Sequence, residues 1–543
     1  MQTRSEKKKE HYQYGVIAAG GPETAEAGMA MLKQGGNAVD AAVAAAFASF
    51  IAEIGVVHLG GSGMAHIYNP DDGHSIVYDF FSNSPGLDGP ANPPEAMDFS
   101  EITVDFGETT QNFHLGRASV AVPGNIFGLC RMAKDHGRLP LATLLQPAIK
   151  LAEEGLEIAP FQANTCKLLT PLYTHTTGMR AIFLRNGRMI QPGEHLYIPD
   201  LTRTLIEIAA DGEQVLRNGR LAHALLDDQA ANGGLLTARD LQHYQVLKLP
   251  SIRVPYRDYE ILLPPRSSTG GVLTAFTMNL LAHFNVSRWE HGTLQHLRRL
   301  YEIMAATSRA RPIWEKLSVE LPVEEALRQF LSKDLADQYE QEIREALAQP
   351  TAAPAPPEPA GAANTSHLSV MDSRGMSVSL TTTAGESAGY VVPGTGFIPN
   401  NIMGEEDLHP LGFHTRPPGR RIPTMMTPAI VLCNNQPRVV VGSGGSVRIR
   451  SAIMQVLSNL LDFGMGLHKA VNAPRVHIED GVLQCEAGYN PEAVSGLEAL
   501  GYAVNRWQSR SIYFGGAHSV SRTKDGRLFG AGDNRRGGAT IAF

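Results

Sequence analysis

The chain has 543 residues, of which 43% are hydrophobic and 19% charged, with a formal net charge of −7 at pH 7. This composition is typical of a soluble globular protein, long enough for several domains or for one large layered fold. The negative charge excludes non-specific binding to nucleic acid or to acidic membranes. The most apolar window, residues 38–57, contains two carboxylates and is mostly alanine, which favours a packed helix over a membrane span.

Metal-binding and export signals are missing from the printed sequence. The four cysteines stand far apart and the histidines form no H-E-x-x-H motif, so we expect no metal and no cofactor. The basic run at residues 7–9 is not followed by an apolar segment. From this start we expect a cytoplasmic protein; a periplasmic or secreted one would need residues upstream of it.

The first 350 residues are predicted to begin with strands and to continue mostly as helices. A strand at residues 15–19 precedes helices at 22–34 and 38–52, which Gly35-Gly36-Asn37 separates. Strands at 64–68 and 75–80 flank a turn. Further helices are predicted at residues 144–154, 201–210, 269–284, 294–310 and 323–348.

Beyond residue 364 the pattern changes to hairpins. Strands are predicted at 367–371 and 376–383, at 429–433 and 438–441, and at 517–523 and 527–531. Helices at 447–461 and 490–500 lie between them. Strand pairs at both ends of the chain, with helices between, fit layers of helices over stacked sheets.

The junction between these two parts is where we expect chemistry. Residues 350–363 hold five prolines and six alanines, too little apolar side chain to order a segment, and they lead directly into Asn364-Thr365. If the Asn364–Thr365 bond is cut, Thr365 gains a free α-amine that can act as general base for its own hydroxyl. An ordinary interdomain linker is the simpler interpretation of the same stretch.

Two glycine-containing motifs offer other interpretations. The loop Gly442-Ser443-Gly444-Gly445 joins a strand to a helix, either as a simple tight turn or as backbone N–H groups that hold an anion or an oxyanion. Residues 385–389 read G-E-S-A-G, the nucleophile elbow of an α/β-hydrolase with Ser387 as nucleophile. The residues that follow are β-branched and broken by proline and glycine, so the required helix is not expected there.

Several motifs together resemble the γ-glutamyltranspeptidase family, in the family's order from about residue 15 to the C-terminus. The more specific are G-G-N-A-V-D-A-A-V-A from residue 35 and T-S-H-L-S-V from residue 365. The weaker ones are V-P-G at 122, P-P-R-S-S-T-G-G at 264, N-N at 400, the glycine loop and N-A-P-R at 472.

The resemblance implies an α+β fold, the four-layer αββα sandwich of the N-terminal nucleophile hydrolases with a large helical portion. It also implies a precursor that cuts itself between Asn364 and Thr365. Residues 1–364, ending in a tether at 349–364, would form a large subunit, residues 365–543 a small one, and the two would remain associated.

The resemblance also assigns roles to single residues. Thr365 would be the nucleophile of self-cleavage and of turnover, and Thr383 would hydrogen-bond and orient it. Gly444 and Gly445 would supply the N–H groups of an oxyanion hole. The substrate-binding residues would be Asn401 and Glu405, on the segment that leads to the group holding the α-amine, and Thr424, where a serine of the family helps to bind the α-carboxylate.

The chain departs from the family at the substrate pocket. The arginine that the family uses to pair with the γ-glutamyl α-carboxylate is replaced in Asp79-Phe80-Phe81-Ser82, and the two-serine motif has become Thr424-Met425. Gly385 stands where the family has asparagine. The carboxylate anchor would then have to be another arginine, with Arg117, Arg266 and Arg448 as the candidates.

We therefore expect a self-processing amidohydrolase or acyltransferase that acts on a small-molecule amide through a threonyl acyl-enzyme. A γ-glutamyl compound such as glutathione is the substrate that the family implies. The alternatives are an amidohydrolase of the same fold with a non-glutamyl acyl substrate, of the oxamate or β-lactam acylase kind, or an unprocessed relative that only binds a ligand.

Overall fold

The protein is described here by a computed structural model that covers residues 14–89, 96–105, 110–349, 364–409, 411–479 and 481–543. Within the tether predicted at residues 349–364, residues 350–363 lie outside the described residues, as does the basic run at residues 7–9. No helix in the described ranges is long and apolar enough to cross a membrane.

One antiparallel sheet of seven strands carries the start of the predicted small subunit in its middle. Its order is β10-β3-β2-β14-β13-β1-β22. The strands are β1 (Gly15–Ala19), β2 (Ser62–Asn69), β3 (His74–Phe80), β10 (Leu247–Leu249), β13 (Ser366–Asp372), β14 (Ser377–Thr383) and β22 (Ala539–Ala542). Strands from both sides of the 364/365 junction therefore lie together in one sheet.

A second antiparallel sheet of six strands has the order β11-β12-β15-β16-β20-β21. Its strands are β11 (Ile252–Tyr256), β12 (Tyr259–Leu263), β15 (Ala429–Cys433), β16 (Gln436–Val441), β20 (Ser519–Arg522) and β21 (Leu528–Ala531). Here too, β11 and β12 come from before the junction and pair with strands from after it.

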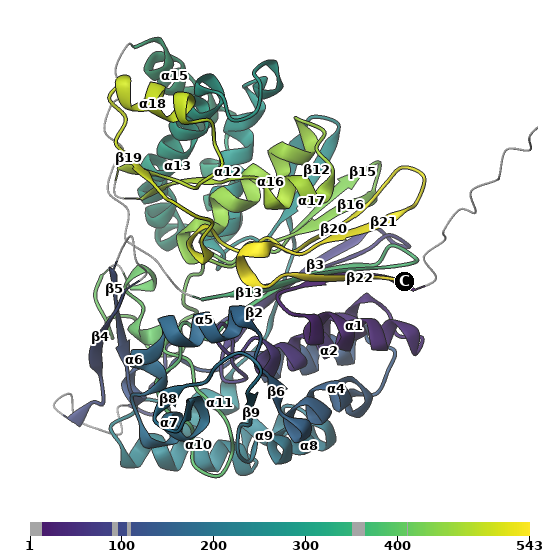
Figure 1. Ribbon diagram of the computed structural model, residues 1–543, viewed down its shortest axis with the longest axis vertical. Coiled ribbons are helices and arrows are strands. Elements are labelled where there is room, and N and C mark those ends of the chain that lie inside the picture. The colour runs from purple at the N-terminus through teal and green to yellow at the C-terminus, as the bar shows by residue number, and fades with distance from the viewer. Residues whose placement is uncertain (1–13, 90–95, 106–109, 350–363, 410, 480) are drawn as a thin grey trace, which may run out of the picture.

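The two sheets stack on each other in the middle of the molecule (Figure 1). An apolar cluster that includes Met371, Val440 and Val520 fills the space between them. Polar side chains cross the same space, since Ser369 Oγ donates to the carbonyl of His518 at 2.9 Å and Ser379 Oγ donates to that of Val441 at 2.9 Å. The sheets are thus joined by hydrogen bonds as well as by apolar packing.

Helices cover the outer face of each sheet and complete four layers (Figure 1). On the seven-stranded sheet lie α1 (Pro22–Lys33), α2 (Ala38–Ala52) and α3 (Asn125–His136), with α4 (Leu141–Glu154) outside them, and on the six-stranded sheet lie α12 (Thr269–Ala282) and α16 (Ile449–Leu461). Every residue of α2 is buried, which its alanine-rich sequence permits because small side chains allow close packing on both sides. Asn37 caps its start by accepting from Val39 and Asp40 N–H, and its end brings Glu53 to β13.

The remaining elements extend the two helical layers or form small hairpins. The helices are α5 (Pro160–Leu168), α6 (Thr170–Tyr173), α7 (Thr177–Phe183), α8 (Leu201–Asp211), α9 (Gln214–Arg217), α10 (Arg220–Ala231), α11 (Ala238–His243), α13 (Leu294–Glu320), α14 (Val323–Phe330), α15 (Lys333–Ala348), α17 (Leu467–Asn472) and α18 (Pro491–Ala499). The strands are β4 (Ser100–Asp105), β5 (Thr110–Leu115), β6 (Leu156–Glu157), β7 (Leu184–Arg185), β8 (Arg188–Met189), β9 (His195–Leu196), β17 (Val476–Glu479), β18 (Val482–Cys485) and β19 (Val504–Arg506).

The expected α+β sandwich of four αββα layers is confirmed, with corrections inside the helical body. The helix predicted at 323–348 is two helices, because Ser332 caps a new start by accepting from the N–H of Leu335. The helix predicted at 294–310 continues to Glu320. Strands β10, β11, β12 and β22 were not predicted, since they are short and gain stability from pairing with strands distant in sequence.

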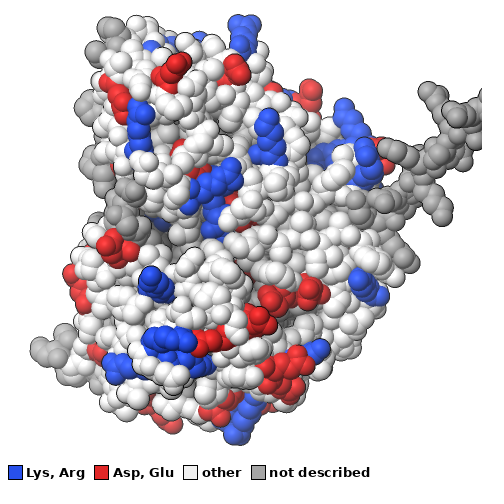
Figure 2. Space-filling view, in the orientation of Figure 1, with Lys and Arg blue, Asp and Glu red and all other residues white. Residues whose placement is uncertain are grey.

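On the face drawn in Figure 2, the charged side chains show no strong separation by sign. In Figure 2, basic and acidic side chains alternate over the described residues of the visible face. Many of them form exposed ion pairs within a helix, such as Arg344 with Glu340 in α15. Pairs of this kind add little to stability, so the informative charges are the buried ones.

Candidate active site

The predicted cleavage junction is buried at the edge of β13. Asn364 and Thr365 immediately precede the first residue of this strand, and both are almost completely buried. The register of β13 places Ser366 opposite Thr382 of β14, so the junction lies next to the end of β14. The two central strands therefore bring Thr365 and Thr383 together.

The carbonyl of the Asn364–Thr365 peptide bond accepts a hydrogen bond from a hydroxyl. Thr383 Oγ1 donates to the carbonyl oxygen of Asn364, and the N–H of Gly385 donates to Thr383 Oγ1 at 3.0 Å. The resemblance predicts instead that Thr383 orients Thr365; in the uncut chain Thr383 bonds to the junction carbonyl. A donor in this position polarises the carbonyl toward attack by a nucleophile.

The buried carboxyl group of Glu386 binds Asn364, the residue that carries this carbonyl. Glu386 Oε1 accepts from the backbone N–H of Asn364 at 2.8 Å, and Glu386 Oε2 accepts from Asn364 Nδ2 at 2.7 Å. Burial raises the pKa of Glu386 to about 8, against the opposing effect of the two hydrogen bonds from Asn364. The junction is thus fixed from both sides, by Thr383 and by Glu386.

Two more buried carboxyl groups belong to the same region, with Glu405 close to Glu386 and Asp407 close to Glu405. Burial, with Asp407 and Glu386 nearby, raises the pKa of Glu405 well above its usual value, and Glu405 Oε1 has no hydrogen-bond partner. Burial also raises the pKa of Asp407, which accepts from Ser446 Oγ. Carboxyl groups with raised pKa values gathered at one place are typical of functional sites.

The segment after β14 is shaped around the predicted residues Asn401 and Glu405. Asn401 Oδ1 accepts from the N–H of Glu386 at 2.7 Å. Gly385 has φ +64°, and a Cβ there would lie 2.2 Å from Asn401 Oδ1 and 2.6 Å from Glu405 Oε1. The family's asparagine does not fit at position 385 of this chain, because Asn401 and Glu405 occupy its space.

The glycine loop before α16 packs directly against the nucleophile residue. A Cβ on Gly444 would lie 2.0 Å from the carbonyl oxygen of Thr365, so only glycine fits there, and Gly445 has φ +116°. The Gly444 N–H donates to the carbonyl of Gly516 at 3.3 Å in this uncut arrangement. The oxyanion-hole role of Gly444 and Gly445 stays a prediction.

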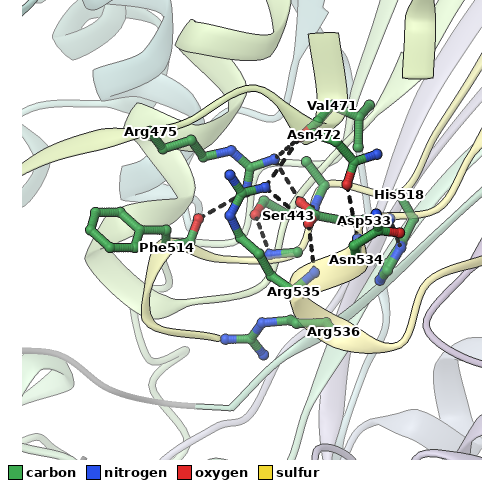
Figure 3. Close-up of polar contacts among 12 residues, drawn as sticks. Ser443, Val471, Asn472, Arg475, Phe514, His518, Asp533, Asn534, Arg535 and Arg536 are labelled. Carbon is green, nitrogen blue, oxygen red and sulfur yellow. Dashed lines mark hydrogen bonds and ion pairs between the residues drawn. The ribbon is translucent and has the colours of Figure 1, made fainter. Parts of the chain in front are cut away.

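An arginine that the sequence did not single out contacts Thr365. Arg536 Nη1 donates to the Thr365 carbonyl at 2.9 Å, and burial and Arg448 lower the pKa of Arg536 to about 10. Figure 3 shows Arg536 pointing away from a cluster of ion pairs on the same turn. In that cluster Asp533 accepts from Arg475 at 2.6 Å and from Arg535 at 3.1 Å. This network fixes the turn, and with it Arg536.

Glu53, at the end of α2, supports the residue after the nucleophile. It accepts from Ser366 Oγ and, at 2.8 Å, from Thr24 Oγ1. Burial raises the pKa of Glu53 to about 7. Through these two hydrogen bonds Glu53 connects the start of β13 to α1.

The third predicted substrate-binding residue, Thr424, lies in the loop before β15. It is buried and bonds to backbone groups, accepting from the N–H of Met426 at 3.2 Å and donating its own N–H to Ser267 at 3.1 Å. None of the contacts described for it reaches Thr365, so its role in carboxylate binding remains a prediction.

The three candidate anchor arginines differ in what surrounds them. Arg117 pairs with Asp98 and Asp228, and burial and the nearby Arg420 lower the pKa of Arg266. Arg448 is buried and its Nη1 lies 3.6 Å from Glu479 Oε1, while its Nε has no hydrogen-bond partner and its charge acts on both Glu386 and Asp407. Arg448 is therefore the candidate that belongs to this site. At the family's arginine position, the third of Asp79-Phe80-Phe81-Ser82, the chain has the buried Phe81.

Glu386, Arg536 and Glu53 contact the junction residues and were missed by the sequence analysis. Glu386 was visible only as part of the G-E-S-A-G match, and Arg536 lies 171 residues after Thr365, so only the fold brings them together. One group with metal-ligand geometry, His283, Asp337 and Glu340, occurs among the described residues, and in it His283 pairs with Glu340.

Comparison with known proteins agrees with this geometry. The family model described as gamma-glutamyltranspeptidase matches residues 24–543. The chain is 34% identical to an acylase ACY 1 proenzyme of Pseudomonas sp. (strain V22), over 99% of this chain and 95% of that one. It is 27% identical to the glutathione hydrolase proenzyme of Escherichia coli (strain K12), over 96% and 90%.

The fold comparison leads to the same group. The crystal structure of cephalosporin acylase from Bacillus halodurans superposes with a TM-score of 0.82 at 25% identity, covering 100% of this chain and 98% of that one. Both relatives compared by sequence are named proenzymes, which implies precursors that are processed. The chain belongs to the gamma-glutamyltranspeptidase family and is an enzyme of the N-terminal nucleophile hydrolase class.

Proposed function

We propose that this chain cuts its own Asn364–Thr365 bond and then uses Thr365 as an N-terminal nucleophile on the amide bond of a γ-glutamyl compound. The proposal rests on the hydrogen bonds made to the junction. Thr383 donates to the carbonyl of Asn364, and Glu386 accepts two hydrogen bonds from Asn364. A linker that merely passed between domains would need neither contact.

Self-cleavage then follows as an acyl shift. Thr365 Oγ adds to the carbonyl carbon of Asn364, and the negative charge that develops on the carbonyl oxygen is stabilised by Thr383. The carbon–nitrogen bond breaks, the hydroxyl proton ends on the nitrogen, and an ester joins Asn364 to Thr365. Water hydrolyses the ester to the carboxylate of Asn364, which restores the hydroxyl and leaves a free amine on Thr365.

Turnover uses the same groups on an external amide. The Thr365 amine takes the hydroxyl proton as Oγ attacks the substrate carbonyl, and returns it to the leaving amine. Water or an acceptor amine then releases the acyl group. Gly444 lies against Thr365, and its loop is the proposed source of oxyanion N–H donors.

The buried charges support a γ-glutamyl substrate. Its α-ammonium would meet the carboxyl groups of Glu386, Glu405 and Asp407, and its α-carboxylate would meet Arg448, whose Nε is without a partner. Arg448 would then replace the anchoring arginine that the family has near position 82. Because the substrate carries its ammonium and its carboxylate on the same carbon, its binding site must supply both a negative and a positive group.

A non-glutamyl acyl amide is the second candidate. The observation that favours it is Phe81, which stands where the family has its arginine, together with the 34% identity to a protein named acylase. The same threonine chemistry would then act on a different acyl group. The two candidates share self-cleavage and differ only in what the buried carboxyl groups bind.

The two products of cleavage are expected to stay together as large and small subunits. Strand β13 pairs with β1 on one side, β14 pairs with β2, and β12 pairs with β15, so each sheet contains strands of both parts. Separation would expose the edges of both sheets and the core between them.

The test is intact mass under denaturing conditions, with Thr365→Ala beside the wild type. We expect fragments 1–364 and 365–543 from the wild type and a single chain from Thr365→Ala. An uncut wild-type chain that is folded and labelled by no amide or ester probe would contradict the proposal and favour an unprocessed ligand-binding relative.

A further inference from the structure

The uncut chain contains its own example of a bound acyl group. In self-cleavage Thr365 Oγ would be acylated by Asn364, and in turnover the same oxygen would be acylated by the substrate. Asn364 therefore occupies the position that the acyl group of a substrate must take. Its contacts in the structure show which chemical groups that position accepts.

The side chain of Asn364 has the same length as a γ-glutamyl chain. Counting from the carbonyl carbon, Nδ2 of asparagine is attached to the third carbon, after Cα and Cβ. In a γ-glutamyl group the α-amino nitrogen is also attached to the third carbon from the scissile carbonyl. Nδ2 of Asn364, which donates to Glu386 Oε2 at 2.7 Å, therefore marks the place of that amino nitrogen.

Glu386 loses its donors when Asn364 leaves. Among the described residues, the hydrogen-bond donors to its carboxylate both belong to Asn364. After cleavage Asn364 is a chain end, and it must vacate this position before a substrate reaches Thr365. Burial disfavours the charged form of this carboxyl group, and a cationic group in the vacated place would stabilise that form.

We propose that Glu386 determines substrate specificity by binding an amino group on the third carbon from the scissile carbonyl. This rests on the proposed function and goes beyond it, because it selects acyl groups that carry this amine over acyl groups of equal length that lack it. Glu405 lies beside Glu386, but no described contact joins Glu405 to Asn364. The amine is therefore assigned to Glu386.

Four anilide substrates distinguish the effect of the amino group on the rate from that of the carboxylate, using the wild-type protein alone. The acyl groups are γ-glutamyl, with both groups; glutaryl, with the carboxylate alone; 4-aminobutanoyl, with the amine alone; and butanoyl, with neither. We expect kcat/KM of the wild type to be about 10- to 100-fold higher for γ-glutamyl than for glutaryl anilide, and for 4-aminobutanoyl than for butanoyl anilide. This is the range of a charge-assisted hydrogen bond.

The variant Glu386→Gln tests the residue. The readout is the ratio of kcat/KM with and without the amine, corrected for the cleaved fraction by intact mass, and we expect it to fall to about 1. Glu302→Gln is the matched control, because Glu302 is also a buried glutamate with a raised pKa, bonded to Tyr502 in a distant part of the fold. Its ratio should equal that of the wild type.

Three outcomes would overturn the inference. The first is a wild-type ratio near 1, or cleaved wild type that accepts none of the four anilides. The second is a ratio that Glu386→Gln leaves unchanged. The third is a ratio that Glu405→Gln removes while Glu386→Gln does not. If Glu386→Gln fails to mature, the wild-type ratios still test the preference for the amine, and loss of that preference in Glu405→Gln would overturn its assignment to Glu386. Failure of the proposed function itself is seen separately, as wild-type protein that stays uncut.

Discussion

Two clusters of buried charge in this molecule are built on opposite principles. Around Asp533, Arg475 and Arg535 supply positive charges that hold the pKa of Asp533 well below its usual value although burial raises it. Around Glu386, burial dominates and the pKa is raised to about 8. The first cluster is compensated within the protein. In the second cluster, Glu386 accepts its two hydrogen bonds from Asn364, the residue that cleavage is proposed to release.

This difference suggests a structural role for the cluster around Asp533 and a ligand-binding role for the cluster around Glu386. A compensated network fixes a backbone turn, and Figure 3 shows how it holds the turn that ends in Arg536. Carboxyl groups that depend on a leaving residue are instead poised for another ligand. The predictions that follow test whether the two clusters respond to mutation in these two ways.

The largest expected effect is on stability, from Arg535→Ala. Arg535 bonds to both Glu486, at 2.5 Å, and Asp533, and all three side chains are fully buried. Removing it leaves two buried carboxylates without this partner, which costs about 3–5 kcal/mol. Urea unfolding followed by circular dichroism measures the change.

The matched control for this prediction is Arg506→Ala. Arg506 pairs with Glu498 at 2.7 Å on the surface, where an ion pair contributes less than about 1 kcal/mol. Equal losses for Arg535→Ala and Arg506→Ala would show that the Asp533 cluster does not stabilise the fold as described.

The next effect is on the rate of self-cleavage, from Thr383→Val. Valine keeps the shape but removes the hydroxyl that donates to the Asn364 carbonyl. Loss of one donor to a developing oxyanion slows a reaction by about 10²–10³-fold. Intact mass against time gives the rate, with Thr383→Ser as the variant that retains the hydroxyl. Cleavage of Thr383→Val at the wild-type rate would remove Thr383 from the mechanism.

A smaller effect, dependent on pH, is expected from Glu53→Gln. The pKa of Glu53 is raised by burial from 4.5 to about 7, so between these values the folded state binds more protons than the unfolded state. The stability that this provides is complete below pH 4.5 and is lost as pH rises through 7, by roughly 3 kcal/mol. Glutamine does not titrate and should show no such loss.

The measurement is the free energy of unfolding of both proteins from pH 5 to 9. The wild type should lose stability relative to Glu53→Gln as pH rises, while the exposed residue changed in Glu320→Gln should give a constant difference. A difference between wild type and Glu53→Gln that stays constant with pH would contradict the burial of an uncharged Glu53.

Much of this could be predicted from the sequence, and the rest could not for identifiable reasons. The alternation of residues 367–371 and 376–383 predicted the central hairpin, and the T-S-H-L-S-V motif located Thr365. Strands β11 and β12 were missed because residues 247–263 contain two prolines and only short apolar runs, and the pairing of these strands depends on β15. Local sequence carries no signal for such distant partners.

The site shows the same limit. Thr365, Thr383 and Gly444 were found because motifs mark them, and the fold places all three together. Glu386 and Arg536 were missed because a buried charge looks like any other charge in a sequence. Their importance lies in contacts across 22 and 171 residues, which only the three-dimensional structure supplies.

The smallest expected effect comes from Ser387→Ala, which separates the G-E-S-A-G match from the threonine mechanism. A nucleophile elbow requires a strand that turns into a helix, yet no helix follows β14 before a short 3-10 turn at Ile402–Gly404. Ser387 Oγ accepts from the N–H of Gly389 at 3.0 Å, a local turn contact worth about 1 kcal/mol. Self-cleavage and anilide hydrolysis should therefore persist in Ser387→Ala, and abolished hydrolysis in cleaved, folded protein would restore the serine as nucleophile.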